Sequence, residues 1–400
     1  MNIAVAQSGG PTCAINASLV GVFKEALKAP DIDAVFGSIN GIEGIIKDEL
    51  IDLRPVIRTN EDMELLRQTP STVLGSCRYK LPPAEEGGEI YEKIAACFEK
   101  HRIEAFFYIG GNDSMDTVDK LSAYLLSIGS GVRVVGIPKT IDNDLPITDH
   151  TPGFGSAAKY VAATVQEIIR DSSVYSIESV TIIEIMGRHA GWLTASTCVL
   201  RANDEVAPHL IYLPECEFSA EKFLEDVRSM QAKYKAVVVA VSEGVRLPED
   251  SRKSVAVDGF GHEYLSGIGK TLEQLVRNNI GCKVRSVELN VMQRCSSHIC
   301  SKTDIDEAEL IGAEGVKHAL SGETGVMMCF RRLSDVPYVM DIVGVGAGQV
   351  ANKEKFFPLE WINDSHNDVR PEAVRYFLPL IQGEVKISMR NGMPLHYKLK

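Results

Sequence analysis

The 400-residue sequence lacks several features that would assign it to a class at once. No apolar run approaches the roughly 18 residues that a membrane-spanning helix needs. The N-terminus does not have the basic and then apolar layout of a signal peptide, and no short-period repeat or low-complexity segment is present. The nine cysteines stand at irregular spacings. In a chain of this size without an export signal, we expect reduced thiols and a cytoplasmic location.

Positive charge is also in short supply. The chain has 42 Lys and Arg against 54 Asp and Glu, which is a formal net charge of −12. A protein that binds duplex nucleic acid needs a dense basic surface to replace counterions, so this balance argues against such a partner. Small anionic substrates remain compatible with it, provided that local Arg, Lys, metal or backbone N–H groups hold their charge.

Short apolar runs that end in glycine or polar residues are abundant. Apolar residues make up 45% of the chain and charged residues 24%, as in globular proteins. We expect strands at residues 2–7, 105–109, 132–137, 180–185 and 236–241. Continuous apolar strands that alternate with helices indicate parallel sheets covered on both faces, and two such sheets fit this length better than one. Ligands of open α/β sheets bind where the strands end.

Two glycine turns follow predicted strands and precede predicted helices. Glycines in residues 8–10 (Ser-Gly-Gly) would let backbone N–H groups approach an anion at a helix N-terminus, although a tight turn is the simpler interpretation. Residues 110–114 (Gly-Gly-Asn-Asp-Ser) repeat this layout. Asp113 either caps the following helix or faces a bound anion, whose phosphate it would repel unless a metal intervenes.

Residues 138–144 (Pro-Lys-Thr-Ile-Asp-Asn-Asp) are the segment richest in chemistry. Lys139 offers a compact positive charge for a phosphate. Asp142 and Asp144 share a side of an extended chain, so one could accept a hydroxyl proton while the other holds a metal or orients its neighbour. A turn rich in Asp and Asn is the alternative. A lysine beside two carboxylates at a strand end favours the functional interpretation.

Further strand ends carry charged residues. Arg188, in the segment Met186-Gly187-Arg188, is suited to spread phosphoryl charge, although a surface loop arginine is the simpler interpretation. Glu243 ends the valine-rich strand and could accept hydrogen bonds from sugar hydroxyls. Three other arginines, taken one by one, are more typical of an ordinary surface: Arg78, Arg285 and Arg294.

Taken together and in this order, these segments resemble the 6-phosphofructokinase family. The match spans roughly residues 1–310 and also includes residues 75–78 (Gly-Ser-Cys-Arg) and Gln293-Arg294. The Pro-x-Thr-Ile-Asp-Asn-Asp and Met-Gly-Arg segments are highly specific to it. The resemblance implies two similar Rossmann-like α/β/α domains with the active site in the cleft between them. The expected donor-binding domain is 1–153 plus about 293–360, and the expected sugar-binding domain is 154–292 plus about 361–400.

The resemblance implies phosphoryl transfer to the 1-hydroxyl of D-fructose 6-phosphate, with Mg²⁺ and a homodimeric or homotetrameric assembly. Asp142 would be the base, in a catalytic group that also contains Lys139, Asp113 and Arg188. Positions that match the family's sugar contacts are Thr140, Ile141, Asp142, Met186, Gly187, Arg188, Glu243, Gln293, Arg294 and, reaching in from a neighbouring subunit, Arg285. Positions that match its donor-phosphate contacts are Gly10, Arg78 and Lys139.

Asp113 and Lys139 discriminate between phosphoryl donors. ATP-using members of the family have glycine at both positions, whereas an Asp and Lys pair resembles the pyrophosphate-dependent branch. The Asp113 carboxylate would repel the α-phosphate of a nucleotide, and Lys139 would stabilise a leaving phosphate that carries no adenosine. The expected donor is therefore pyrophosphate, with a reaction that runs both ways.

Several positions depart from the family pattern. Asn112 stands where the Mg²⁺-associated Asp is usual, and a neutral amide binds a hard cation more weakly than a carboxylate does. Asn112 and Asp144 are therefore the weak candidates for metal ligands, and Asp113, Asp144 or pyrophosphate itself could carry more of the metal. Ser179 replaces an arginine that many members present from the adjacent subunit. Val291 replaces a common His or Tyr, and Cys295 replaces a usual glycine.

Three other functions are compatible with parts of the sequence. The nearest is an ATP-dependent enzyme of the same family. A catalytically silent subunit that binds sugar phosphate belongs to a different class, and the presence of both Asp142 and Arg188 argues against it. A nicotinamide dehydrogenase is disfavoured because the dinucleotide glycine fingerprint is absent. Residues 352–400 are expected to be ordered and to wrap across the domains.

Overall fold

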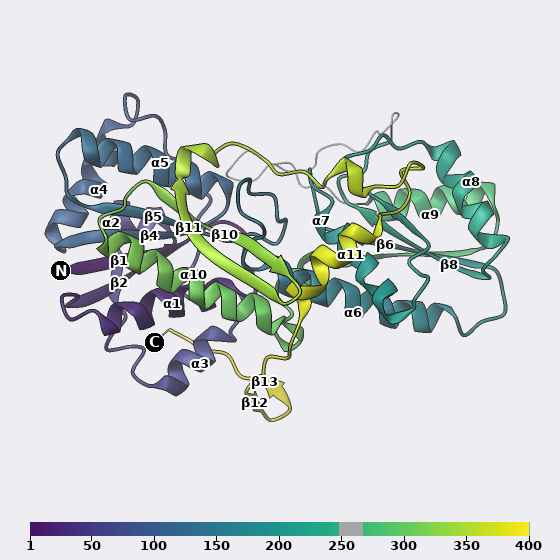
Figure 1. Cartoon of the computed structure of the whole chain (residues 1–400), viewed down its shortest axis with the longest axis horizontal. Helices are drawn as coiled ribbons and strands as arrows, with labels where there is room; N and C mark the ends of the chain where they lie inside the picture. The colour runs from purple at the N-terminus through teal and green to yellow at the C-terminus, as the bar shows by residue number, and fades with distance from the viewer. Residues whose placement is uncertain (248–266, 400) are drawn as a thin grey trace.

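Two β-sheets, lying side by side in Figure 1, organise the chain. The structure is a computed structural model that describes residues 1–247 and 267–399; residues 248–266, which fall in the expected sugar-binding domain, and residue 400 lie outside the described part. One sheet has the strand order β11-β10-β5-β4-β1-β2-β3 and the other β7-β8-β6-β9. Among the described helices, none is long and apolar enough to cross a membrane.

The first sheet combines strands from both ends of the sequence. They are β1 (Asn2–Gln7), β2 (Ala34–Ser38), β3 (Leu50–Asp52), β4 (Ile103–Gly110), β5 (Arg133–Pro138), β10 (Val326–Asp335) and β11 (Tyr338–Gly346). Its helices are α1 (Ile15–Lys28), α2 (Ile42–Lys47), α3 (Asn60–Arg67), α4 (Gly88–Lys100), α5 (Asn112–Ser127) and α10 (Lys302–Leu320). Alternate residues of the strands point to opposite faces: Val5 and Phe107 pack in one buried cluster, Ala4 and Phe106 in another.

The second sheet is wholly parallel. Its strands are β6 (Ser179–Ile185), β7 (Leu210–Tyr212), β8 (Ala236–Ser242) and β9 (Lys283–Glu288). Its helices are α6 (Phe154–Ser172), α7 (Trp192–Ala195), α8 (Ala220–Gln231), α9 (Ile268–Asn279) and α11 (Pro371–Phe377). Val238 belongs to the cluster that contains α6 and α11, and Val239 to the cluster that contains α8 and α9. The predicted α/β class, with sheets covered on both faces, is confirmed.

Short elements lie in the connections. The 3₁₀ helices are η1 (Ser196–Asn203), η2 (Asn290–Arg294), η3 (Ser297–Ile299), η4 (Ala347–Gln349), η5 (Leu359–Trp361) and η6 (Leu378–Ile381). A small hairpin near the C-terminus is formed by β12 (Met389–Arg390) and β13 (Met393–Pro394).

All five predicted strands are present, within two residues of their expected bounds. The prediction of purely parallel sheets is wrong at both edges of the first sheet, where β3 runs antiparallel to β2 and β11 antiparallel to β10. The turn between β10 and β11 has only two residues, Val336 and Pro337. A connection this short can join only antiparallel strands, since a parallel pair needs a long crossover.

The C-terminal part of the chain passes over both halves. After β11 it leaves the first sheet, forms α11 against the second, and then returns toward α3, as the yellow segment in Figure 1 shows. There the Tyr397 hydroxyl donates to the Val56 carbonyl at 3.0 Å, and the Tyr397 N–H donates to Thr69 Oγ1 at 2.8 Å. The expectation that this segment is ordered and wraps across the molecule is confirmed up to residue 399.

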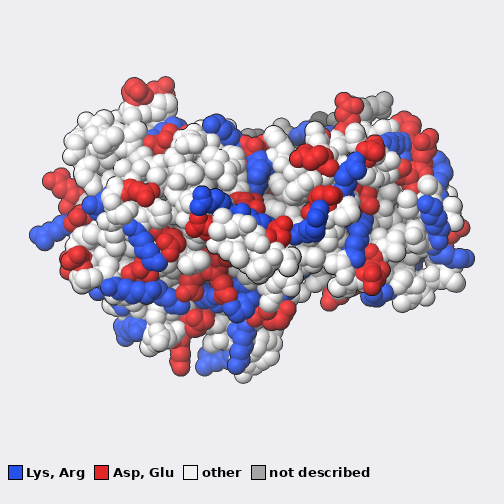
Figure 2. All heavy atoms as spheres, viewed as in Figure 1, with Lys and Arg blue, Asp and Glu red and all other residues white. Residues whose placement is uncertain are grey.

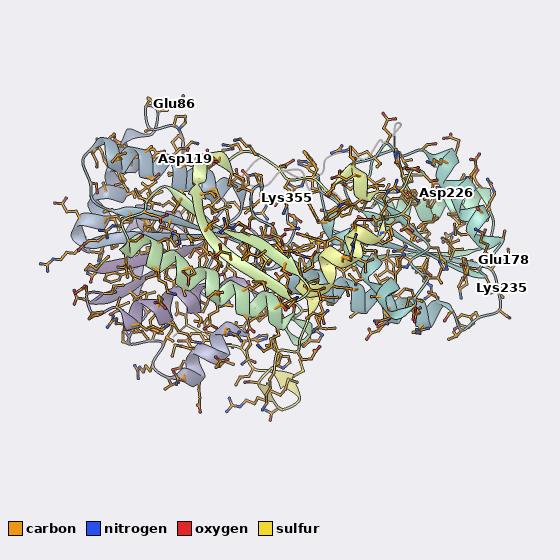
Figure 3. All side chains as sticks on the ribbon, viewed as in Figure 1. Glu86, Asp119, Glu178, Asp226, Lys235 and Lys355 are labelled. Atoms are coloured by element: carbon orange, nitrogen blue, oxygen red, sulfur yellow. The ribbon has the colours of Figure 1, made fainter. Side chains whose placement is uncertain are left out.

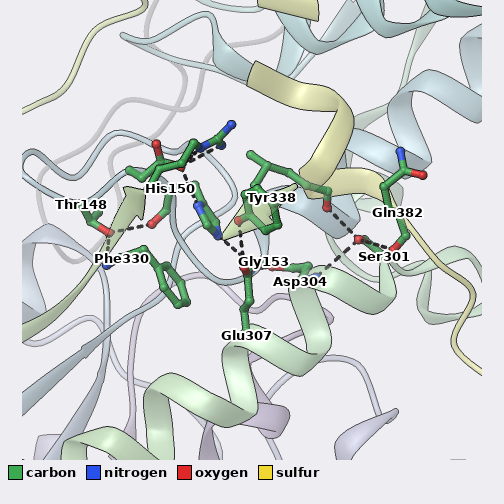
Figure 4. A network of polar contacts seen from close by, with 12 residues as sticks. Thr148, His150, Gly153, Ser301, Asp304, Glu307, Phe330, Tyr338 and Gln382 are labelled. Atoms are coloured by element: carbon green, nitrogen blue, oxygen red, sulfur yellow. Dashed lines mark hydrogen bonds and ion pairs between the residues drawn. The ribbon is translucent and has the colours of Figure 1, made fainter. Parts of the chain in front are cut away.

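Helix α10 anchors the first turn of α6. Asp304 Oδ1 accepts a hydrogen bond from the Gly153 N–H at 2.8 Å, and Asp304 Oδ2 accepts one from the Ser156 N–H at 3.0 Å (Figure 4). These N–H groups have no partner within the helix, so a buried carboxylate satisfies them. Asp304 therefore fixes the C-terminal end of the long loop between β5 and α6, which contains residues 139–144.

A buried imidazole holds the same loop from another side. His150 lies between Asp149 Oδ2 (2.9 Å) and Glu307 Oε2 (2.8 Å) and stacks on the Phe330 ring (Figure 4). Burial lowers the pKa of His150, but the charges and hydrogen bonds of Glu307 and Asp149 outweigh it and raise the pKa to about 9. His150 is therefore a buried cation between two carboxylates at neutral pH.

Candidate active site

A cleft of about 700 Å³ lies between the two sheets at the carboxyl ends of their strands. The loops after β1, β4 and β5 line one side, and those after β6, β8 and β9 line the other. Ligands of open α/β sheets bind at this edge. Most of the predicted site residues line this cleft: Gly10, Arg78, Asn112, Asp113, Lys139, Thr140, Ile141, Asp142, Asp144, Met186, Arg188, Glu243 and Arg294.

Lys139 lies at the end of β5, against the glycine turn after β1. Its Nζ donates to the Gly10 carbonyl at 2.7 Å. Gly9 has a φ of 75°, and a Cβ there would lie 3.2 Å from Lys139 Nζ, so glycine suits both the turn and the approach of the lysine. Burial lowers the pKa of Lys139 to about 7, with nearby Asp142 opposing the shift and Arg294 adding to it. An arriving anion would complete its protonation.

Arg294 connects the two sides of the cleft. It belongs to η2, which follows the last strand of the second sheet. Its guanidinium group nevertheless reaches the glycine turn after β1, because a Cβ added to Gly10 would lie 3.4 Å from Arg294 Nη1. Lys and Arg are interspersed with Asp and Glu over the face that Figure 2 shows. The cleft also contains both signs of charge: its lining includes five cations, which are Arg78, Lys80, Lys139, Arg188 and Arg294, and seven carboxylates, which are Asp113, Asp142, Asp144, Glu184, Glu243, Glu288 and Glu354. The cations that an anionic substrate needs are therefore present in the cleft, among carboxylates that a divalent cation could bind.

Asp113 is in the first turn of α5. The N-cap of that helix is Gly111, and within the described residues no side-chain hydrogen bond caps the helix, so the capping interpretation of Asp113 is not supported. Its Oδ1 lies 3.5 Å from Lys80 Nζ, and both residues line the cleft. Lys80 was not among the predicted site residues. The sequence shows only that it follows Arg78 by two residues, and it does not show whether a lysine in a loop points into a cleft or into solvent.

Asn112 joins α5 to the segment that leaves the first sheet. Its Oδ1 accepts a hydrogen bond from the Asn352 N–H at 2.5 Å, and its Nδ2 donates to the Lys353 carbonyl. The amide that we predicted as a weak metal ligand is therefore engaged on both its oxygen and its nitrogen. Its place at the rim of the cleft follows from these two backbone contacts.

Half-buried carboxylates line the same cleft as the cations. Burial raises the pKa of Asp142, while Arg188 and Lys139 oppose the shift. Burial and the neighbouring Asp142 raise the pKa of Asp144 to about 7. A divalent cation would relieve this repulsion, and Mg²⁺ is commonly held by one or two carboxylates together with substrate phosphates. The donor set of Asp142 and Asp144 fits such an ion.

On the side of the cleft formed by the second sheet, Arg188 provides a hydrogen-bond donor and Glu243 provides a carboxyl group. The Nε atom of Arg188 is buried and has no hydrogen-bond partner among residues 1–247 and 267–399, so it is available to an anion. Glu243 Oε1 accepts a hydrogen bond from the Gly187 N–H at 3.3 Å. Burial, with a contribution from Asp142, raises the pKa of Glu243 to about 7. The loop after β6 thus offers both a cation and a carboxyl group.

Two of the predicted sugar contacts, Gly187 and Gln293, do not line the cleft but fix the backbone of the loop after β6. Gln293 is buried, and its Oε1 accepts a hydrogen bond from the Met186 N–H at 3.3 Å. Gly187 has a φ of 143°, and a Cβ there would lie 2.7 Å from the Ala190 carbonyl oxygen. Both residues fix the backbone that presents Arg188.

Arg285 is a third predicted sugar contact that does not line the cleft of this chain. It lies in β9, and its Nη1 forms an ion pair with Asp171 Oδ2 at 3.0 Å. Val174, Tyr175 and Ile177 follow close to Asp171 in the sequence and are at least half exposed. This part of the surface therefore combines a cation with exposed apolar side chains.

The comparisons with known proteins agree with this geometry. The family model described as Phosphofructokinase matches residues 2–318. A Methylococcus capsulatus protein named pyrophosphate--fructose 6-phosphate 1-phosphotransferase is 40% identical over 98% of this chain and 94% of its own length. A Halomonas elongata protein of the same name is 38% identical over 100% of this chain and 96% of its own.

A solved structure shares the whole fold. It is described as a pyrophosphate-dependent phosphofructokinase from Marinobacter aquaeolei and is 37% identical to this chain. The match has a TM-score of 0.89 and covers 100% of this chain and 96% of that one. With its cleft between two α/β halves and its matches over nearly the full length, the chain belongs to the phosphofructokinase family.

Proposed function

We propose that this chain transfers a phosphoryl group from pyrophosphate to the 1-hydroxyl of D-fructose 6-phosphate, giving fructose 1,6-bisphosphate and phosphate, reversibly. The observation that carries the proposal is the buried Lys139, whose ammonium group lies 2.7 Å from the Gly10 carbonyl on the side of the cleft that Asp113 also lines. The relatives that match nearly the whole chain are named for the same donor and sugar.

The cleft supplies a base and charge stabilisation. Asp142 accepts the proton of the 1-hydroxyl as the sugar oxygen bonds to phosphorus and the bridging P–O bond of pyrophosphate breaks. Lys139, with Arg78 and the Gly10 turn, holds the diphosphate and the leaving phosphate. Arg188, whose Nε has no partner in the described part of the chain, stabilises charge on the transferred group. Asp113 disfavours a nucleotide.

Mg²⁺ is the proposed cofactor. When bound, it supplies positive charge that neutralises the diphosphate. Asp144 is the residue that would hold it, beside the base Asp142, with Asn112 contributing weakly if its amide leaves its present contacts.

The remaining substrate contacts divide between the chain and its neighbour. Thr140, Ile141, Met186, Gly187, Glu243 and Gln293 surround the sugar or support the loops that do so. Arg294 and, from a neighbouring subunit, Arg285 bind the 6-phosphate, in a homodimer or homotetramer. The apolar residues Val174, Tyr175 and Ile177 near Arg285 support such an interface.

We assign residues 1–153 with about 293–360 to a donor-binding domain, and 154–292 with about 361–400 to a sugar-binding domain. The strands of the two sheets divide along the chain in the same way, whereas the end of the chain, around Tyr397, contacts Val56 and Thr69 of the donor-binding domain. A cytoplasmic location is proposed because all nine cysteines are free thiols.

A donor assay tests the function. The purified chain is given fructose 6-phosphate and Mg²⁺ with either pyrophosphate or ATP, and fructose 1,6-bisphosphate is measured. We expect turnover with pyrophosphate and at least 100-fold less with ATP. The Asp113→Gly variant should narrow that ratio, since it removes the charge that disfavours a nucleotide. Turnover with ATP alone would identify the ATP-dependent alternative, and no turnover with either donor would favour the silent subunit.

A further inference from the structure

A segment that no sequence motif marks lies along the cleft. Residues 352–357, which we call the crossing segment, connect the first half of the molecule to the second, and Figure 3 labels Lys355 near the middle, between the two halves. Asn352 contacts the start of α5 through Asn112, and Glu354 Oε1 lies 2.8 Å from His189 Nδ1 in the loop after β6. The segment thus touches both sides of the site.

Lys355 binds the loop that carries the proposed base. Its Nζ donates to the Asp149 carbonyl at 2.8 Å and to the Thr148 carbonyl at 3.1 Å, and it lies 3.4 Å from Asn143 Oδ1. An ammonium group has three N–H donors, and all three find an acceptor in this one loop. The side chain therefore holds residues 143–149 at several points at once.

The backbone of Lys355 adds two further links. Its N–H donates to the Asp144 carbonyl at 2.6 Å, and its carbonyl accepts a hydrogen bond from Trp192 Nε1 at 3.0 Å. Its ammonium group also lies over the Trp192 ring, 4.9 Å from the ring centroid. Trp192 begins α7, directly after the loop that presents Arg188. One residue thus connects the loop of Asp142 with the loop of Arg188.

The loop needs such support because its backbone is strained. Asn143 has a φ of 56° and Ile147 a φ of 71°. A positive φ is tolerated by Asn but is unfavourable for a β-branched residue such as Ile, so it persists only where surrounding contacts impose it. The hydrogen bonds from Lys355 reach acceptors on either side of Ile147. Asp142 directly precedes this strained stretch.

We propose that Lys355 is a positioning residue for phosphoryl transfer: its ammonium group holds the 143–149 loop so that the Asp142 carboxylate meets the sugar hydroxyl. The proposal rests on the proposed function and names a residue that the sequence analysis did not. Lys355 does not itself line the cleft, so it acts through the loop and not on a substrate. Its loss should therefore affect the reacting geometry more than substrate binding.

Lys355→Met tests the proposal because it keeps the length of the side chain but removes its charge and its donors. We expect kcat with pyrophosphate to fall by roughly 30- to 100-fold, as for a base displaced by a fraction of an ångström, while both KM values change less than about threefold. Lys355→Arg keeps a cation that can reach two carbonyl oxygens, and its kcat should lie above that of Lys355→Met. Lys353→Met, an exposed lysine of the same segment, is the matched control and should retain wild-type kcat.

Calorimetric binding of fructose 6-phosphate verifies that each variant is folded. If Lys355→Met does not fold, Tyr376→Phe replaces it in the experiment. The Tyr376 hydroxyl donates to the same Asp149 carbonyl at 2.6 Å, so its removal should also lower kcat. An unchanged kcat in the folded variant, or a loss confined to KM, overturns the positioning role. If the wild-type chain has no pyrophosphate activity, the proposed function fails instead, so the two failures are distinguishable.

Discussion

Lys139→Met is the sharpest test of how this site selects its donor. The substitution keeps the stem of the side chain and removes an ammonium group that lies 2.7 Å from the Gly10 carbonyl at the end of β5. A hydrogen bond to a charged group contributes roughly 1.5–3 kcal/mol, which corresponds to a loss of about 10- to 150-fold in kcat/KM for pyrophosphate. Because the pKa of Lys139 is lowered to about 7 by burial, only about half of the free protein carries the proton at pH 7. Half protonation reduces the contribution of the ammonium group at pH 7 by roughly 0.4 kcal/mol, which leaves the expected loss in kcat/KM within the same range.

The pH profile separates this role from a general loss of activity. The profile of kcat/KM reports groups of the free enzyme, so the wild-type value for pyrophosphate should decline as the pH rises through about 7 and Lys139 loses its proton. The assay holds the concentration of the Mg²⁺–pyrophosphate complex constant across the pH range. Lys139→Met should lack this alkaline decline, and its calorimetric affinity for fructose 6-phosphate should stay within about threefold of wild type. A variant that retains full kcat/KM, or that shows the same decline at the same pH, would refute the reasoning.

Three further outcomes are expected. Asp142→Asn should lower kcat by about 10²- to 10⁴-fold with little change in KM, because it removes a base and keeps the shape; a near-normal kcat in a steady-state assay would exclude that role. His150→Gln should lower the free energy of unfolding, measured in urea, by up to about 3 kcal/mol at pH 6: the folded pKa of about 9 lies above the ordinary histidine pKa of about 6.5, so this stabilisation is complete below about pH 6.5 and is lost as the pH rises through 9. An equal effect at pH 6 and pH 9.5 would contradict it. Arg285→Met should raise the KM for fructose 6-phosphate about tenfold or more, and mixing it with Asp142→Asn should restore activity if subunits share sites; absence of complementation in a mixed oligomer would argue against a shared site.

Motifs at strand ends could be predicted from the sequence because each consists of neighbouring residues: an apolar run and the glycine or charged residues that follow it. An apolar run followed by glycine or charge predicts a strand and the side chains at its carboxyl end, and strands of a parallel sheet end at one edge. Lys139, Asp142 and Arg188 were identified on this basis, and the structure places all three in one cleft. The charge of Asp113 beside that cleft follows from the same pattern.

Other groups at the site have no local signal. Lys80 and Lys355 are single lysines in loops, and their partners, Asp113 and the Asp149 carbonyl, are distant in the sequence. The antiparallel edge strands escaped prediction for a related reason, since the direction in which a strand pairs depends on its connection and its neighbours. For Asn112, the pattern suggested a weak metal ligand, whereas the structure engages its amide with the backbone of Asn352 and Lys353.

By itself, the sequence determined the α/β class, the chemistry of the strand ends and the resemblance to one family, because periodicity and motif order are properties of neighbouring residues. Only the tertiary structure decided which groups meet. It lowers the pKa of Lys139 by burial, leaves Arg285 away from the cleft of its own chain and brings the crossing segment against the loop of Asp142. Burial and contact across hundreds of residues arise when the two halves pack together, and no short stretch of sequence contains that information.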